Sequence, residues 1–378
     1  MAKKETKTER LASLDALRGF DMLFIMGFAS LVVCICKLWP DNASAQWIAA
    51  QMDHVEWHGL AHHDTIFPLF LFLAGVSFPF SMASQQAKGR SKGQIALRAV
   101  KRGLILVFLG MVYNGLFDLN FGSLRVASVL GRIGLAWMFA ALLFLAFKPR
   151  TLGILSAVIL IGYWLLLWLV PNSSDPFSYQ DNLVGVVDRQ LLPGILLYGN
   201  SELGMKNGWF DPEGLLSTVP AIATALLGML TGTLVRMSDK QLSGNRKALY
   251  MALGGVAFVI IGCLWNIVFP INKKLWTSSF VCVLAGYSLL LFALFYYLID
   301  VKGWKKWAFP LKVIGMNSIT IYMARRIVSF YSIERFFLGG LAAKCPEVWG
   351  NIINEAGCLL LSWLFLWFLY KNKVFLKV

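Results

Sequence analysis

Long apolar runs recur along this chain and decide what it can fold into. Stretches of about 18 to 22 apolar residues match the length of a helix that crosses the roughly 30 Å hydrocarbon core of a bilayer. The 378-residue sequence is 58% hydrophobic and only 15% charged, with a mean hydropathy of +0.65. A soluble globule cannot bury that much apolar surface, and disordered or fibrous chains have other compositions. We therefore expect an all-α, polytopic membrane protein.

The pattern predicts about ten membrane-spanning helices. They begin near Leu17, Ile66, Gly103, Val126, Leu152, Leu215, Ala248, Ser278, Phe309 and Ile352, and Gly, Pro, Asn or clustered charges end each apolar run. This divides the chain into a basic tail at residues 1–16 and a single transmembrane domain at residues 17–378. Outward loops are expected at residues 39–65 and 171–214.

The formal charge of +15 has to be interpreted by position, because membrane proteins carry excess Lys and Arg in their cytoplasmic loops. Most basic residues fall in the terminal segments and in the even-numbered loops, for example at residues 88–102, 236–247 and 302–312. An even number of spans with this asymmetry predicts that both termini are cytoplasmic. The asymmetry also explains the net charge without nucleic acid as a partner.

The four histidines of the chain lie within ten residues, immediately before the second predicted span. The stretch reads HVEWHGLAHHD and contains His54, Glu56, His58, His62, His63 and Asp64. The predicted topology places this cluster at the outer mouth of the membrane. An imidazole there can exchange protons near neutral pH.

Three interpretations of the cluster stay open on the residues alone. The spacing of His54, His58 and His62 would place them on one face of a continuous helix, as in a metal site, although the order is not that of the zincin motif. Alternatively, the histidines and Trp57 form a belt at the lipid headgroups. In the third interpretation one imidazole is a catalytic base or group carrier, oriented by neighbouring acids.

Polar side chains inside predicted spans are functional candidates, because a charge at the bilayer centre costs at least about 2.5 kcal/mol. Arg18 lies at the cytoplasmic end of the first span, and Arg132 lies about two turns in from the outer end of the fourth. Asn114 and Asn317 must also find partners in hydrocarbon. Anchoring or snorkelling of the arginines at the interface is the alternative. The resulting polar path suits a transmembrane group transfer or a proton-coupled transporter of a small polar solute.

Five stretches of sequence carry a resemblance to a known family. They are SLDALRGFDM at residues 13–22, HVEWHGL with DTIFPLFLFLAGVSFPFSM at residues 54–82, DPEGLLST at residues 211–218, NKKLWTSSFV at residues 272–281, and PLKVIGMNSITIYM at residues 310–323. In this order and at these separations, the chain resembles the transmembrane acyltransferases related to heparan-alpha-glucosaminide N-acetyltransferase, in particular their bacterial branch.

The resemblance implies an acetyltransferase that moves an acetyl group from cytosolic acetyl-CoA to an amine or hydroxyl of a glucosamine-like sugar on the far side of the membrane. The catalytic histidine of the family's H-x-x-W-N-G-L motif falls on His54, and His58 replaces the motif's asparagine. The aspartate before the F-P-x-F stretch falls on Asp64, and the asparagine of G-M-N-S falls on Asn317.

These correspondences extend to an expected mechanism. The CoA phosphates would lie near Arg18, with Lys101 and Arg102 as further candidates. His54 would be a general base or a transient acetyl carrier oriented by Asp64 or Glu56. Asn114, Arg132 and Asn317 are candidates for donating hydrogen bonds to the oxyanion. No metal is expected.

The expected partners are acetyl-CoA, a sugar or glycan acceptor and the lipid bilayer. The GMLTG stretch at residues 228–232 together with the resemblance makes a homodimer plausible. The expected location is a bacterial cytoplasmic (inner) membrane.

Overall fold

The computed structural model describes residues 11–171, 174–198 and 209–376. These residues form helices and loops, and their β-type pairing is limited to two isolated antiparallel bridges, Arg125 with Gly194 and Tyr198 with Phe210. The all-α membrane architecture expected from the sequence is confirmed.

Eight of the described helical segments are long and apolar enough to cross a membrane, by length and composition. They are α1 to α2 (Ala12–Cys36), α4 (His62–Ala87), α6 (Val129–Ala146), α7 (Pro149–Leu169), α9 (Thr218–Arg236), α10 (Gly244–Trp265), α11 with η3 (Ser278–Val301) and α15 (Glu347–Lys371). Within them, α11 is Ser278–Phe295 and η3 is Tyr296–Val301. The shorter elements outside them include α3 (Ala43–Gln51), η2 (Leu116–Asp118), α8 (Leu183–Leu191) and α14 (Phe330–Ala342).

The other two expected spans take different forms. The third is the helix α5 (Lys92–Tyr113), whose first half carries Lys92, Arg98, Lys101 and Arg102, so only its second half is strongly apolar. The ninth is broken into α12 (Phe309–Gly315) and α13 (Ser318–Ile327), with Met316 and Asn317 between them. A break of this kind frees backbone N–H and C=O groups from the helix, so that they can bond to other groups inside a membrane protein.

The first span is also interrupted and begins earlier than expected. It consists of α1 (Ala12–Leu23), the π-helical η1 (Phe24–Phe28) and α2 (Ala29–Cys36). Gly27 in η1 has a φ of 118°, which only glycine adopts readily, so the helix is kinked there. Residues 12–16, assigned above to the basic tail, belong to α1, and Ser13 to Leu17 are buried. The rest of the expected tail, residues 1–10, lies outside the described residues.

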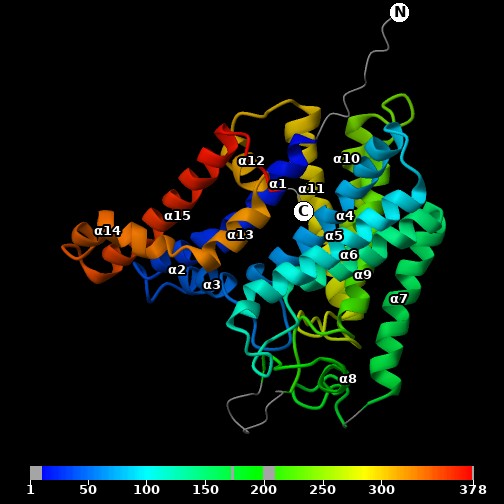
Figure 1. Ribbon diagram of the computed structural model, residues 1–378, viewed down its shortest axis with the longest axis horizontal. Coiled ribbons are helices and arrows are strands. Elements are labelled where there is room, and N and C mark those ends of the chain that lie inside the picture. The colour runs from blue at the N-terminus through cyan, green and yellow to red at the C-terminus, as the bar shows by residue number, and fades with distance from the viewer. Residues whose placement is uncertain (1–10, 172–173, 199–208, 377–378) are drawn as a thin grey trace, which may run out of the picture.

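Helix α4 runs through the centre of the molecule and packs closely against α9 (Figure 1). A Cβ atom added at Gly75 would lie 2.3 Å from the Ala225 carbonyl oxygen, and one at Gly228 would lie 2.2 Å from that of Phe72. The GMLTG glycines therefore bring α9 against α4 inside one protomer. These two glycines are used within the protomer and lend no support to a dimer, which stays a prediction.

A second glycine contact joins the first span to the broken ninth span. A Cβ atom at Gly19 would lie 1.7 Å from the Leu311 carbonyl oxygen, and one at Gly315 would lie 1.8 Å from that of Asp15. Larger residues at these positions would force α1 and α12 apart. This contact places the neighbouring Arg18 beside the break at Asn317.

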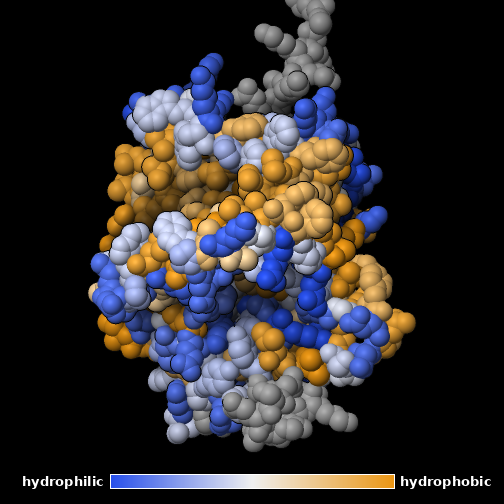
Figure 2. Space-filling view, turned by 90° about the vertical axis from the view of Figure 1, so that its left-hand side faces the viewer, coloured by the Kyte–Doolittle hydropathy of each residue, from blue (hydrophilic) through white to orange (hydrophobic). Residues whose placement is uncertain are grey.

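The outer parts of the molecule differ from this central bundle. Helices α14 and α15 project to one side, and α8 lies at one end of the bundle with the segment at residues 174–198 (Figure 1). On the side of α14 and α15, apolar side chains cover broad areas, and hydrophilic side chains gather at the upper end and around a hollow in the lower half (Figure 2). Phe336 is 84% exposed, as suits a surface against lipid.

Candidate active site

One face of α4 lines three cavities that follow one another through the bundle. Asp64, Phe67, Phe70 and Ala74 are spaced by three, three and four residues, so they share a face of the helix. Asp64 lines the first cavity, Phe67 and Phe70 the second, and Phe70 and Ala74 the third. From Asp64 to Ala74 the helix rises about 15 Å.

The first cavity, here called the histidine cavity, has a volume of about 240 Å³. Its lining includes His54, Val55, Trp57, Asp64, Arg125, Val129, Arg132, Leu197, Tyr198, Pro212, Glu213, Lys273, Lys274 and Trp276. These residues come from four separate parts of the chain, and both charge signs are present. The cavity is therefore equipped for proton transfer and for binding polar groups.

His54 and Asp64 form a hydrogen-bonded pair at the edge of this cavity. His54 Nδ1 lies 2.7 Å from Asp64 Oδ1, and a carboxylate can only accept, so Nδ1 carries the proton. Asp64 Oδ2 also accepts hydrogen bonds from the backbone N–H groups of Val55 and Ala61. The His54 side chain is 47% exposed and that of Asp64 only 1%. The pair leaves Nε2 of His54 as the basic atom, with its ring orientation fixed by a buried carboxylate.

Lys273 also contacts this pair, although no role was assigned to it from the sequence. Its Nζ lies 3.3 Å from Asp64 Oδ1 and 3.1 Å from His54 Nδ1. Burial lowers the pKa of the Lys273 ammonium, and the nearby Asp64 opposes that shift. The NKKLW stretch was noted for its resemblance only. A signal in the sequence was its position, since two adjacent lysines are unexpected in an outward loop.

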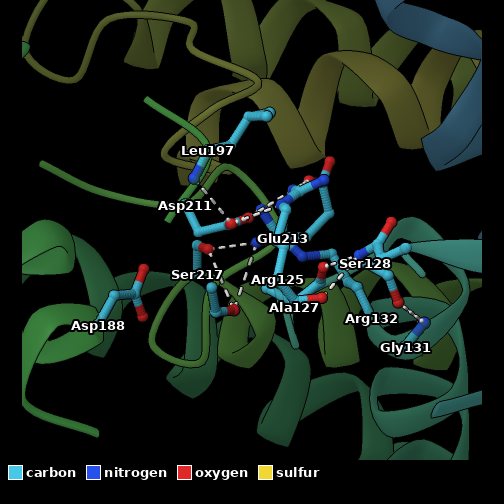
Figure 3. A network of polar contacts seen from close by, with 12 residues as sticks. Arg125, Ala127, Ser128, Gly131, Arg132, Asp188, Leu197, Asp211, Glu213 and Ser217 are labelled. Carbon is cyan, nitrogen blue, oxygen red and sulfur yellow. Dashed lines mark hydrogen bonds and ion pairs between the residues drawn. The ribbon is translucent and has the colours of Figure 1, made fainter. Parts of the chain in front are cut away.

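Arg132 lies in the wall of the histidine cavity and is 1% exposed. Its guanidinium lies 5.0 Å from the centre of the Trp276 ring, and its Nη2 donates to Ser217 Oγ and to the Gly214 carbonyl at 3.4 Å (Figure 3). Nε and Nη1 are buried and have no hydrogen-bond partner in the described part of the chain. Because α6 begins at Val129, Arg132 is in its first turn rather than two turns in.

An ion-pair network forms another part of the cavity wall (Figure 3). Arg125 donates to both carboxylate oxygens of Asp211, at 2.7 and 2.6 Å, and also pairs with Glu213. Sequence reasoning did not single out Arg125 as a site residue. Asp188 lies nearby, fully buried, and burial raises its pKa to about 7.

The remaining residues of the histidine stretch are less involved. His58 Nδ1 lies 3.3 Å from the Asn272 amide nitrogen, while the Glu56 side chain is exposed and only its backbone carbonyl accepts a bond from Lys274. Neither residue lines the histidine cavity. His54 and Asp64 are brought together, whereas Glu56 and His58 are not part of that pair.

The metal interpretation needs His54, His58 and His62 on one helix, but residues 53–61 are not helical and α4 begins at His62. Among the described residues, no group of three or more His, Cys, Asp or Glu side chains is arranged to hold a metal ion.

Asn114 has a structural position. Its side-chain amide donates to the backbone carbonyls of Arg125 and Ala127, at 2.9 and 2.8 Å, and so ties the end of α5 to the segment that precedes α6. Both amide hydrogens are thereby used, and Asn114 lines none of the three cavities.

The third cavity, here called the arginine cavity, has a volume of about 240 Å³ and lies at the break between α12 and α13. Arg18, Arg102 and Asn317 all line it, which brings two of the expected donor-binding residues together with an arginine of α5. Arg102 lies over the Trp137 ring, 4.4 Å from its centre, and its buried Nε has no hydrogen-bond partner among the residues the structure describes. Arg18 donates to Leu73 O at 3.2 Å and to Ser77 Oγ. The cavity therefore presents cationic donors suited to an anion.

The second, middle cavity is small and apolar, with a volume of about 40 Å³. It shares Val129 with the histidine cavity, and it shares Phe70, Ser318 and Ile319 with the arginine cavity. The three cavities therefore adjoin at each junction, with charged groups at the two ends and apolar walls between them.

The helices and the paired His54 and Asp64 define a multi-pass helical membrane protein with a buried polar site. The chain is 26% identical to human heparan-alpha-glucosaminide N-acetyltransferase over 98% of its own length, and 27% identical to the mouse protein over 99%. No family model matches it. The chain is related to heparan-alpha-glucosaminide N-acetyltransferase, and it spans about 60% of the length of these two relatives.

Proposed function

We propose that this protein is an acetyl-CoA-dependent transmembrane acetyltransferase that acts on an amine or hydroxyl group of a glucosamine-like sugar. The observation that carries the proposal is the row of three adjoining cavities along α4, with arginines at one end and His54 at the other. A donor with a phosphorylated head, a long flexible arm and a reactive thioester matches that order. The relationship to an N-acetyltransferase supports the same reaction class.

In this proposal the phosphates of acetyl-CoA bind beside Arg18 and Arg102, because both side chains line the arginine cavity. The buried Nε–H of Arg102 has no hydrogen-bond acceptor among the described residues, so a phosphate oxygen could accept from it. Asn317 lines the same cavity, and its amide is held by the Val374 carbonyl at 3.1 Å. The pantetheine arm passes the apolar middle cavity and brings the thioester to His54.

At the histidine cavity, Nε2 of His54 takes a proton from the acceptor amine or hydroxyl as the acceptor attacks the thioester carbonyl. The carbon–sulfur bond then breaks, the acetyl group stays on the acceptor, and the CoA thiolate takes up a proton. In the alternative route Nε2 attacks the thioester carbonyl first, the carbon–sulfur bond breaks and CoA leaves as its thiolate. The acceptor then attacks the acetyl-imidazole, takes the acetyl group and frees Nε2. Arg132 lines this cavity with Nε and Nη1 unpartnered among the described residues, and in this proposal it stabilises the oxyanion in either route.

The proposed orientation places the arginine cavity towards the cytoplasm and the histidine cavity on the extracytoplasmic side of a bacterial inner membrane, with both termini cytoplasmic. This assignment is supported by the positive-inside pattern of the loops.

A vesicle experiment tests the proposal. Purified protein in liposomes is supplied with radiolabelled acetyl-CoA on one side and glucosamine or a glucosamine-ended oligosaccharide on the other. We expect labelled acetyl sugar on the side opposite the donor. Absence of transfer together with absence of acetyl-CoA binding by calorimetry would reject the proposal.

One observation favours a second candidate, a proton-coupled transporter of a small polar solute. The break between α12 and α13 lines a polar cavity inside the membrane, as broken helices do in many transporters. The same vesicles distinguish the two functions, because a transporter accumulates intact solute and does not bind acetyl-CoA.

A further inference from the structure

Lys273 is placed against the His54–Asp64 pair from a segment 219 residues away in sequence. Its Nζ lies 3.3 Å from Asp64 Oδ1, 3.1 Å from His54 Nδ1 and 3.5 Å from His54 Nε2. The Lys273 side chain is only 18% exposed. A lysine this close to an imidazole affects whether that imidazole carries a charge.

The turn that carries Lys273 is rigid. Asn272 is fully buried, its Oδ1 accepts from Leu275 N at 2.8 Å, and its backbone N–H donates to Thr277 Oγ1 at 3.0 Å. The Leu275 carbonyl accepts a bond of 2.6 Å from the Tyr163 hydroxyl. The turn therefore leaves the Lys273 backbone little freedom.

The same turn includes an unfavourable backbone conformation. Trp276 is fully buried and has a φ of 53°, in the left-handed region that a bulky residue rarely adopts. Conformations of this kind persist where the surroundings enforce them, and they cluster at functional sites. The strained backbone at Trp276 therefore supports a functional role for the position of Lys273.

Several charged and titratable groups surround His54, and together they determine how strongly Lys273 disfavours protonation of the ring. Asp64 faces the ring from α4 and favours its protonated form, while the His63 ring lies 4.6 Å away between ring centres. Asp53 adjoins it in the chain, and Lys274, Arg125 and Glu213 line the same cavity, the last two already paired with each other. Lys273 directly contacts both members of the pair, so it opposes Asp64 most strongly.

We propose that Lys273 is a positioning residue that shares the Asp64 carboxylate with His54 and opposes protonation of the imidazole. The Lys273 ammonium offsets the negative charge of Asp64 and repels a positively charged imidazolium. Both effects disfavour protonation of His54. Asp64 can then orient the ring without fixing a second proton on it, so that Nε2 stays available as a base or nucleophile. The catalytic consequence rests on the function proposed above, whereas the charge balance does not.

Histidine titration tests this directly, because the chain has only four histidines. With ¹³C-labelled histidine in nanodiscs, the His54→Gln variant identifies the His54 signal. We expect Lys273→Gln to raise the titration midpoint of His54 by about one pH unit. Lys273→Arg, which keeps the positive charge, should restore most of the original midpoint.

Lys274 provides a matched control. It lines the same cavity, but its Nζ donates to the Glu56 carbonyl and lies 4.6 Å from the centre of the Tyr198 ring. Lys274→Gln should move the His54 midpoint by a few tenths of a unit at most. In an Asp64→Asn background, Lys273→Gln should give a smaller shift than in the native protein, because the shared carboxylate charge is gone.

The inference fails if Lys273→Gln leaves the His54 midpoint unchanged or lowers it while the other histidine signals keep their native positions. The titration needs neither donor nor acceptor, so a shift without any acetyl transfer would reject the proposed function alone. Transfer that depends on His54, without a shift in the variant, would reject the role of Lys273 alone. In the kinetics, the acid limb of the kcat/KM profile should move upward with the midpoint, whereas a merely structural lysine would lower kcat/KM equally at every pH.

Discussion

The two end cavities have the same volume, about 240 Å³, but opposite chemical character. The histidine cavity mixes a paired imidazole, two carboxylates and four cationic side chains. The arginine cavity has Arg18 and Arg102, and no carboxylate among the described residues that line it. The first cavity can therefore move protons and stabilise changing charge, whereas the second can only hold a fixed anion. In the proposed function, this separation would let the donor head and the reaction lie at different depths of the bundle.

Removal of the His54 imidazole should lower acetyl transfer more than any other change. If it did not, the proposed difference between the histidine cavity and the arginine cavity would be contradicted. His54→Ala should lower acetyl transfer in liposomes about 10²- to 10⁴-fold, because general base catalysis is lost, while acetyl-CoA binding by calorimetry stays close to native. His58→Ala is the control, since His58 contacts Asn272 outside the cavity and should cost much less. Equal losses in both variants would contradict the assignment of His54.

Arg132 should show the next largest effect. Arg132→Gln should lower kcat about 10²- to 10³-fold with little change in KM, because the donors act on charge that develops in the transition state. The measurement is steady-state transfer in detergent micelles, with thermal unfolding recorded for the same sample. A rise in KM at constant kcat would place Arg132 in ground-state binding instead.

The arginine cavity should respond only through the donor head. Arg18→Ala and Arg102→Ala should each weaken acetyl-CoA binding about tenfold, the loss expected for one charge-assisted hydrogen bond. With acetyl pantetheine, which lacks the phosphates and adenine of CoA, the same variants should bind like the native protein. His54→Ala provides the contrast, because it should lower transfer from both donors by the same large factor. An equal loss of binding for both donors in the arginine variants would remove Arg18 and Arg102 from the phosphate site.

The smallest expected effect concerns stability near the histidine cavity. Burial raises the pKa of Asp188 to about 7, well above that of an aspartate in the unfolded chain. This residue therefore favours the folded state below the unfolded-state pKa and loses that contribution as pH rises through about 7. Asp188→Asn, which removes the titration, should therefore gain thermal stability relative to the native protein between pH 5 and pH 8. The measurement is the unfolding temperature of both proteins in detergent at pH 5 and at pH 8. A difference that stays constant with pH would mean that Asp188 does not titrate in this range.

Prediction from the sequence succeeded where a local pattern was sufficient. The apolar runs indicated an all-α membrane protein because hydrocarbon thickness fixes the length of a span. The structure places His54 beside Asp64, whereas Asn317, which was expected to donate to the oxyanion, lines the arginine cavity with Arg18. The roles of these residues stay predictions. Asn114 was also expected to donate to the oxyanion, but its side-chain amide donates to two backbone carbonyls.

The rest depended on contacts between distant segments. The break at Asn317 and the kink at Gly27 are not visible in an apolar count, because hydropathy does not register the direction of a helix. The close approach of Gly228 to α4 could equally have been an interface between protomers. A small-residue pattern indicates close packing but does not identify the partner helix.

The sequence by itself therefore determined the class of protein, the approximate spans and the concentration of titratable groups before α4, since each follows from composition or short spacing. Only the tertiary structure decided that one face of α4 lines three adjoining cavities and that Lys273 contacts His54. The physical reason is that helix rotation and packing determine which side chains meet inside the bundle. Helix rotation and packing are determined by burial over the whole molecule rather than by the sequence of any one segment.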